Sequence, residues 1–429
     1  MPTPSTSATP TPSTDWFDHD RFGMFIHFGL YAMPARHEWV MSIEERDASE
    51  YERYARYFDP DLFDAATFAR LAKDAGMKYV VLTTKHHEGF CLWDTALSDY
   101  SAPQSCGRDL VREFADAVRA EGLKVGLYHS VLDWHHPDYT VDERHPLRNR
   151  SDIDSVDRGK DMARYRDYLH GQVRELLTDY GPIDYMFYDF TFPGEFGKGP
   201  EDWHAEELLA MTRELQPGII VNDRLGIPGD LVTPEQYQPD SPMTDDDGHP
   251  VRWEACQTLN GSWGYDRDNL DFKSTHMLLS MLVDSVAKGG NLLLNIGPDG
   301  RGNVRDEDTQ RLEDIGRWMH LHQRSVYGAG PATSLTAPAG TVMTQREDRV
   351  YVHFLAWPLK HLHLKNAGGR IAYAQLLNDA SEVTFQETDP QARAWNTNVG
   401  GLEPGTVTFH LPVQKPDPWI PVLEIFLEE

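Results

Sequence analysis

Runs of apolar residues alternate with amphipathic helical patterns along the first three quarters of the chain. The clearest run, Ile183 to Phe190, is aromatic and β-branched, and it reaches the carboxylate Asp189 near its end. Its mostly apolar character is typical of a strand buried on both faces of a parallel sheet. An aspartate at the C-terminal end of such a strand lies where α/β folds place their chemistry.

Six other runs resemble this one, and helical patterns separate most of them. The further strands are predicted at residues 21–29, 79–84, 124–129, 218–224, 253–258 and 291–296, and the helices at 64–76, 108–121, 160–180, 202–215, 273–288 and 305–324. Strands that alternate with helices favour a parallel sheet, and seven such strands favour a closed β/α barrel of the TIM type. No eighth strand is visible in the pattern, so we expect the barrel to be irregular.

The periodicity changes near residues 328–331. Beyond that point apolar residues recur at every second position, as in 349–354, 361–364, 405–411 and 422–426. Short alternating strands separated by turn residues predict a β-sandwich. We therefore expect a barrel over residues 15–330 and a β-sandwich over residues 331–429. Residues 1–14 are rich in Pro, Ser and Thr without an apolar run, which predicts an unstructured tail and no signal peptide.

Composition narrows the possible partners. The 40 basic and 68 acidic residues give a formal net charge of −28, which argues against nucleic-acid binding because little basic surface is available to release counterions. The three cysteines form no CxxC motif, so neither a disulfide framework nor a thiolate zinc site is expected. No apolar run is long enough to span a membrane, and we expect a soluble protein that is cytoplasmic by default.

Polar, titratable or aromatic groups stand at or just beyond the C-terminal ends of five of the predicted strands. They are His27, His86 with His87, Tyr128 with His129, Asp189, and Asn222 with Asp223 and Arg224. Because the C-terminal ends of barrel strands converge on one face, these groups predict a shared pocket. Imidazoles, an arginine and an amide suit the hydroxyls of a neutral polyol. Aromatic side chains such as Trp39, Trp134, Trp263 and Tyr265 can cover its C–H faces.

Hydrolysis of a glycosidic bond requires two carboxyl groups, one ionised and one protonated. Asp189 is the first candidate. The second should be a glutamate whose pKa is raised by an apolar setting, and both Glu235 and Glu254 qualify from the sequence. A non-catalytic carbohydrate-binding protein is an alternative, but it would not require both carboxylates.

A metal hydrolase is the competing class, because His86, His87, His135 and His136 occur close together in the chain. Adjacent histidines in an extended segment point to opposite faces, so they rarely bind the same ion. The chain contains no HExxH motif. We therefore do not expect a metal site.

Several segments together resemble the retaining α-L-fucosidases of glycoside hydrolase family twenty-nine. The likeness covers about residues 15–330. It rests on residues 16–17, 22–31, 38–39, 85–90, 126–130, 180–189, 222–224, 233–235, 253–254, 262–265 and 291–298.

This resemblance implies a β/α barrel with a C-terminal β-sandwich that releases terminal α-L-fucose from fucosylated glycans without a cofactor. It implies that Asp189 is the nucleophile and, through the Thr-Pro-Glu pattern, that Glu235 is the acid/base. Where the family usually has Phe-Asp-Gly, this chain has Tyr188-Asp189-Phe190. A related barrel glycosidase for another sugar, such as α-L-galactose, is an open alternative. The resemblance also matches these positions to sugar binding: His27, Glu38, Trp39, His86, His87, Tyr128, Arg224 and Trp263.

Overall fold

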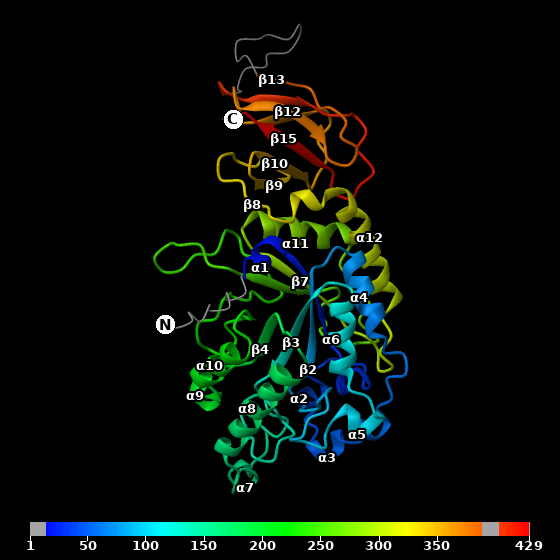
Figure 1. Cartoon of the computed structure of the whole chain (residues 1–429), viewed down its shortest axis with the longest axis vertical. Helices are drawn as coiled ribbons and strands as arrows, with labels where there is room; N and C mark the ends of the chain where they lie inside the picture. The colour runs from blue at the N-terminus through cyan, green and yellow to red at the C-terminus, as the bar shows by residue number, and fades with distance from the viewer. Residues whose placement is uncertain (1–13, 388–402, 429) are drawn as a thin grey trace, which may run out of the picture.

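The computed structural model describes residues 14–387 and 403–428, and it stacks a β/α barrel and a β-sandwich along the long axis of the molecule (Figure 1). The predicted tail therefore lies outside the described residues, apart from Thr14. Among the residues that are described, no helix has the length and apolar character needed to cross a membrane.

Seven parallel strands form the curled sheet of the barrel, in the order β5-β4-β3-β2-β1-β7-β6. This result confirms the predicted barrel class and each of the seven predicted strands. Their bounds are β1 Phe22–Ile26, β2 Tyr79–Lys85, β3 Lys124–Ser130, β4 Tyr185–Asp189, β5 Ile220–Val221, β6 Glu254–Thr258 and β7 Asn291–Ile296. Most of their side chains are buried, as expected for strands covered on both faces.

An irregular segment, residues 231–235, occupies the gap between β5 and β6. It forms isolated parallel bridges to both neighbours: Asn222 pairs with Leu231, Val232 with Trp253, and Glu235 with Cys256. The segment contains Pro234, which has no amide hydrogen to donate to a ladder. This explains why no eighth strand could be read from the sequence, and it places Glu235 beside the C-terminal half of β6.

Helices surround the sheet (Figure 1). The predicted long helices are all present with slightly shorter bounds, and Asp64 caps the first of them by accepting from the amide of Ala66 at 3.0 Å. The helices are α1 Asp15–Asp20, α2 Val40–Ile43, α3 Ala48–Tyr51, α4 Ala65–Asp74, α5 Ala102–Cys106, α6 Leu110–Ala120, α7 Ile153–Val156, α8 Met162–Asp179, α9 Pro200–Trp203, α10 Ala205–Leu215, α11 Thr275–Ala287 and α12 Asp306–His322.

The C-terminal part contains a five-stranded antiparallel sheet, β12-β15-β10-β9-β8, and a three-stranded one, β11-β14-β13. Apolar side chains from both sheets share one core, including Val350, Leu362 and Phe409. The sandwich lies against α11 and α12 (Figure 1), where the indole of Trp318 donates to the carbonyl of Ile420 at 2.8 Å. Its strands are β8 Gly330–Pro331, β9 Thr341–Arg346, β10 Arg349–Phe354, β11 His361–Leu364, β12 Ile371–Leu376, β13 Phe385–Glu387, β14 Val407–His410 and β15 Val422–Leu427.

Candidate active site

A pocket opens at the C-terminal ends of the barrel strands. It brings together most of the side chains that the sequence analysis selected, although they come from distant parts of the chain. The pocket is lined by Phe25, His27, Trp39, His86, His87, Tyr128, Phe187, Asp189, Phe190, Arg224, Glu235, Cys256 and Trp263.

Asp189 is the last residue of β4, and its side chain is only 13% exposed. The hydroxyl of Tyr128 donates to its Oδ2 at 2.8 Å, and Arg224 donates to its Oδ1 at 3.1 Å. Burial raises the pKa of Asp189, whereas the nearby Arg224 charge and the Tyr128 hydrogen bond oppose that rise. The strand end therefore holds a carboxylate that two donors keep in a fixed orientation.

Arg224 connects this carboxylate to the second one. Its Nη1 lies 3.1 Å from Oδ1 of Asp189 and 2.8 Å from Oε2 of Glu235. Two oxygens that contact the same nitrogen at these distances are at most about 6 Å apart, which is below the separation found in inverting glycosidases and close to that of retaining ones. Glu235 is the more exposed of the two carboxylates, with 41% of its side chain accessible.

A hydrogen bond to Asn295 fixes the ring orientation of His27. Its Nδ1 is 2.6 Å from Oδ1 of Asn295, and the amide nitrogen of Asn295 donates to the carbonyl of Trp263 at 2.8 Å. Because the Asn295 oxygen can only accept, Nδ1 of His27 carries the proton. Burial lowers the pKa of His27 well below its usual value, so the imidazole is neutral and its Nε2 is an acceptor.

His87 repeats this arrangement. Its Nδ1 is 2.6 Å from Oγ of Ser130, which itself donates to the carbonyl of Leu132. The hydroxyl therefore accepts from Nδ1, and Nε2 of His87 faces Oδ2 of Asp189 at 4.0 Å. Burial also lowers the pKa of His87 well below its usual value. Both histidines thus offer a neutral Nε2 acceptor to a hydroxyl group.

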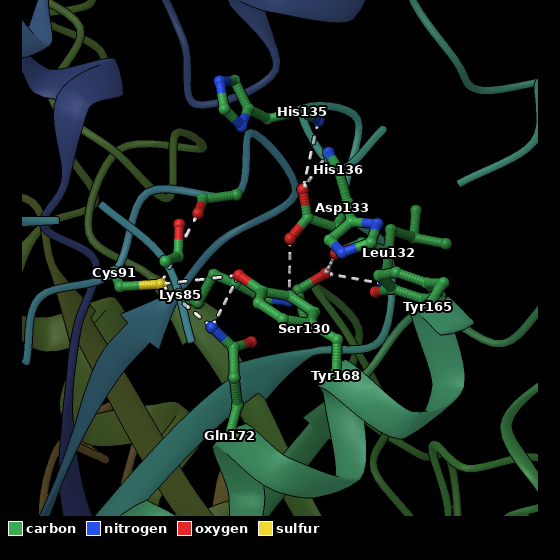
Figure 2. Close-up of polar contacts among 12 residues, drawn as sticks. Lys85, Cys91, Ser130, Leu132, Asp133, His135, His136, Tyr165, Tyr168 and Gln172 are labelled. Atoms are coloured by element: carbon green, nitrogen blue, oxygen red, sulfur yellow. Dashed lines mark hydrogen bonds and ion pairs between the residues drawn. The ribbon is translucent and has the colours of Figure 1, made fainter. Parts of the chain in front are cut away.

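A buried ion pair lies near the segments that follow β2 and β3. Nζ of Lys85 is 3.1 Å from Oδ2 of Asp133, and both side chains are almost inaccessible (Figure 2). Oδ1 of Asp133 accepts from the backbone amides of residues 135 and 136. The same carboxylate packs so closely on Gly89, at φ +82°, that a Cβ there would lie 2.3 Å from Oδ1. The pair therefore joins the segment after β2 to the segment after β3.

Seven of the predicted positions lie outside the pocket lining: Glu38, His129, Trp134, Asn222, Asp223, Glu254 and Tyr265. Glu38 is buried, accepts from the amide of Gly264 at 3.0 Å, and so supports the loop that carries Trp263. Glu254 is the first residue of β6, at the opposite end of the barrel, where the hydroxyls of Tyr79 and Tyr185 donate to its carboxyl group. The structure thus brings Glu235, and not Glu254, next to Asp189.

The four histidines that suggested a metal do not form one cluster. His86 and His87 both line the pocket, with ring centroids 4.0 Å apart, so the expectation that they point to opposite faces is wrong, whereas His135 and His136 lie outside the lining. His135 stacks on the ring of Tyr100 and is 2.9 Å from a carboxylate oxygen of Glu52, away from the pocket. Within residues 14–387 and 403–428, no three histidine, cysteine or acidic side chains come close enough together to hold a metal ion.

Some site residues were not selected from the sequence. Phe25, Phe187 and Cys256 line the pocket, and Ser130 and Asn295 hold its histidines. Ser130 and Asn295 stand at or near strand ends, a position that could have identified them. Phe25, Phe187 and Cys256 lie within strands, where side chains point alternately toward and away from the barrel axis. Only the geometry of the sheet shows that these three reach the pocket.

Phe190 adopts a backbone conformation that L residues avoid, with φ +82°. Its ring packs on Trp39 and His87, with centroids 4.9 and 5.1 Å apart. The residue that replaces the glycine usual in this motif is therefore part of the pocket wall, next to the Asp189 carboxylate.

A β/α barrel with two carboxylates about 6 Å apart or less, set among imidazoles and aromatic rings, defines the class of barrel glycosidases. Comparison with known proteins places the chain within that class. The model of the α-L-fucosidase family matches residues 2–324. The chain belongs to the α-L-fucosidase family and is a glycoside hydrolase.

Individual relatives agree with this assignment. The chain is 32% identical to rat tissue α-L-fucosidase over 387 residues, which cover 83% of this chain and 78% of the relative. Alpha-L-fucosidase isoenzyme 1 from Paenibacillus thiaminolyticus superimposes with a TM-score of 0.91 at 44% identity, covering 97% of this chain and 98% of that one. A Bacteroides thetaiotaomicron α-L-fucosidase trapped as a covalent intermediate with 2-fluoro-fucosyl fluoride gives a TM-score of 0.81 at 29% identity, covering 96% and 95%.

Proposed function

We propose that this enzyme releases terminal α-L-fucose from glycans by a retaining double displacement in which Asp189 is the nucleophile and Glu235 is the acid/base. The observation that carries the proposal is the position of Arg224, which contacts both carboxylates at 3.1 and 2.8 Å. A short separation between the carboxylates leaves no space for an attacking water on the far side of the sugar, so it favours attack by the carboxylate itself.

The surroundings of Asp189 suit a nucleophile. Arg224 and Tyr128 donate to its two oxygens and favour the ionised form that must attack the anomeric carbon. As the covalent bond forms, the carboxylate loses its charge and the leaving oxygen gains electron density. That oxygen must then receive a proton from a second group.

Glu235 suits this second role. It lies on the irregular segment between β5 and β6, is partly open to solvent, and contacts Arg224. A partly exposed carboxyl group at the edge of the pocket can protonate the leaving oxygen, exchange with the departing glycan, and then activate a water molecule. Water attack on the covalent intermediate regenerates Asp189 and releases fucose with its original configuration.

The rest of the pocket suits a neutral deoxy sugar. The Nε2 atoms of His27 and His87 can accept hydrogen bonds from ring hydroxyls. The indole of Trp263, with its centroid 5.1 Å from that of His27, offers an apolar face to C–H groups and to the methyl group of fucose. The hydroxymethyl group of L-galactose would have to be accommodated against the same apolar surface.

The decisive experiment separates the two carboxylates by leaving group. Removing a general acid costs about 10²–10⁴-fold where the leaving group requires a proton. Glu235→Ala should therefore lose hydrolysis of natural fucosides while sparing aryl fucosides with acidic phenols. Azide should restore the turnover of this variant and yield the α-azide, because the intermediate on Asp189 still forms. With Asp189→Ala, azide should instead give the β-azide.

Glu254→Ala is the matched control, since it removes a buried carboxyl group that lies at the other end of the barrel. If Glu254→Ala shows the leaving-group dependence and azide rescue while Glu235→Ala does not, the acid/base assignment is wrong. Parallel assays with an aryl α-L-galactoside test the sugar assignment, and turnover that favours the galactoside over the fucoside would contradict it.

A further inference from the structure

All three histidines of the pocket turn Nδ1 away from the sugar site. His27 directs it to the amide oxygen of Asn295 and His87 to the hydroxyl of Ser130. Nδ1 of His86 instead faces a carboxylate, because it lies 3.5 Å from Oε2 of Glu88. Glu88 has no role in the mechanism described above, and it does not line the pocket.

Glu88 is unusual among the buried acidic groups. Its side chain is 1% exposed, and neither carboxylate oxygen accepts a hydrogen bond from any residue in the described part of the chain. A buried carboxyl group without donors costs free energy, and native proteins seldom retain one without a reason. The hydroxyls of Tyr51 and Tyr100 are likewise buried without a partner among the described residues.

The only nearby basic side chain in the same segment is not available to Glu88. Lys85 is paired with Asp133, over the rings of Tyr165 and Tyr168 (Figure 2). Glu88 also lies near the side chains of Tyr31, Tyr51 and Tyr100, but within the described residues its one ion-pair contact is the imidazole of His86, which has no hydrogen-bond partner at Nδ1. The two unsatisfied groups therefore face each other directly behind the pocket wall.

We propose that Glu88 is a positioning residue for the reaction: it accepts from Nδ1–H of His86 and thereby holds the ring with Nε2 directed at the sugar. A carboxylate behind an imidazole fixes both the tautomer and the orientation of the ring, as in catalytic triads. The 3.5 Å distance shortens to a hydrogen bond when the pocket closes around a sugar and excludes water. This inference rests on the proposed contact between His86 and the substrate.

If Glu88 is a positioning residue, its replacement should weaken sugar binding without lowering the stability of the fold. Replacing a buried, unpartnered carboxylate by an apolar group of similar shape is neutral or stabilising. Glu88→Leu should therefore unfold at the same temperature as the parent or higher, yet bind fucose less well. Asp133→Leu is the matched comparison, because it removes a buried carboxylate that has a full set of partners. It should lower the melting temperature by leaving Lys85 buried and unpaired.

The test measures KM and kcat for an aryl fucoside and the inhibition constant of L-fucose. In Glu88→Leu, KM and the inhibition constant should rise together by about 10–100-fold, by analogy with the loss seen when the partner behind a metal-binding imidazole is removed. Active sites counted by a burst titration should be unchanged. Glu88→Gln should recover part of the loss, because its amide oxygen can still accept from Nδ1–H. In a His86→Ala background, Glu88→Leu should have no further effect.

Each outcome is informative. If His86→Ala leaves KM and the inhibition constant unchanged, the proposed sugar contact fails and this inference fails with it. If His86→Ala weakens binding but Glu88→Leu does not, only the role of Glu88 is overturned. A Glu88→Leu variant that melts earlier and loses activity in proportion to its active sites would show a purely structural role. Additive losses in the double variant would contradict the proposed coupling.

Discussion

Each end of the barrel holds a buried carboxyl group, and the two groups differ in their hydrogen-bond partners and in their access to the pocket. Asp189, at the C-terminal end of β4, receives a hydrogen bond from a tyrosine and one from an arginine and opens to the pocket. Glu254, at the N-terminal end of β6, is sealed between the hydroxyls of Tyr79 and Tyr185. Burial raises the pKa of Glu254 to about 8, which the two hydroxyls only partly oppose.

The comparison shows two features that the proposed nucleophile has and Glu254 lacks, a compensating charge and access to the pocket. At the C-terminal end, the Arg224 cation is present and the second carboxylate is partly exposed. At the N-terminal end, no cation contacts Glu254 within the described part of the chain, and the group holds its proton at neutral pH. The position of a carboxyl group along its strand therefore decides its surroundings.

The largest contrast in activity is expected between Asp189→Asn and Glu254→Gln, which make the same isosteric change at opposite ends. Loss of the nucleophile removes the covalent pathway, so Asp189→Asn should lower kcat on every fucoside by roughly 10⁴-fold or more. Glu254→Gln replaces a group that is already uncharged, and it should change kcat little. The measurement is steady-state kinetics with an activated aryl fucoside. Comparable losses in the two variants would contradict the functional division between the ends.

A smaller contrast should separate His87→Ala from Tyr185→Phe. Loss of a hydrogen bond to a substrate hydroxyl costs about 1–3 kcal/mol, so His87→Ala should lower kcat/KM for fucosides of any leaving group by roughly 5–150-fold. Tyr185→Phe removes a donor to Glu254 and should lower the melting temperature while kcat/KM stays near that of the parent. Kinetic assays and thermal denaturation on both variants test this. A His87→Ala enzyme as active and stable as the parent would make that residue dispensable.

Phe190 should show a still smaller effect, because it contributes to the wall and not to the chemistry. Both Phe190→Gly and Phe190→Ala remove the ring that packs on Trp39, but only glycine is relaxed at φ +82°. The glycine variant should therefore be more stable than the alanine variant by about 1 kcal/mol. Chemical denaturation of the two variants measures this difference. Equal stability would mean that the backbone relaxes when the ring is removed.

The least effect on activity, but a distinct effect on stability, is expected from Glu254→Gln as pH changes. The pKa of Glu254 is raised from 4.5 to about 8 in the folded chain, so the folded state binds the proton more tightly than the unfolded state. Its contribution to stability is fully present below about pH 4.5 and is lost as pH rises towards 8.

The parent should therefore lose stability between pH 5 and 8 more steeply than Glu254→Gln, which has no proton to release. Melting temperatures of both proteins across that range provide the measurement. Parallel curves would show that Glu254 does not hold a proton in the folded state over this interval.

The local pattern was sufficient for most of the barrel. The apolar runs at 79–84 and 124–129 became β2 and β3 with ends shifted by one residue, because strands buried on both faces are apolar throughout. The helix over 64–76 became α4, since its cap and its apolar stripe are both local features. The strands β8, β9, β12 and β13 were not predicted, because they are too short or their sequences alternate only weakly.

Some residues of the candidate site could be predicted from the sequence and others could not. The sequence by itself determined which groups stand at strand ends, including Asp189, His27 and His87, because the position of a residue after an apolar run is a local property. The residues alone left both Glu235 and Glu254 open for the second carboxylate, and the family resemblance, through the Thr-Pro-Glu pattern, favoured Glu235.

Only the tertiary structure shows where these two glutamates lie relative to Asp189. Residues 231–235 follow no regular period, and their place between β5 and β6 depends on closing the barrel. The direction of β6 then puts Glu254 at its start, near Tyr79 and Tyr185, and leaves Glu235 beside Arg224. The contact between His86 and Glu88 is likewise a matter of side-chain orientation within a loop. The burial and the pairing of these side chains depend largely on groups distant in the chain, so the local sequence pattern does not predict them.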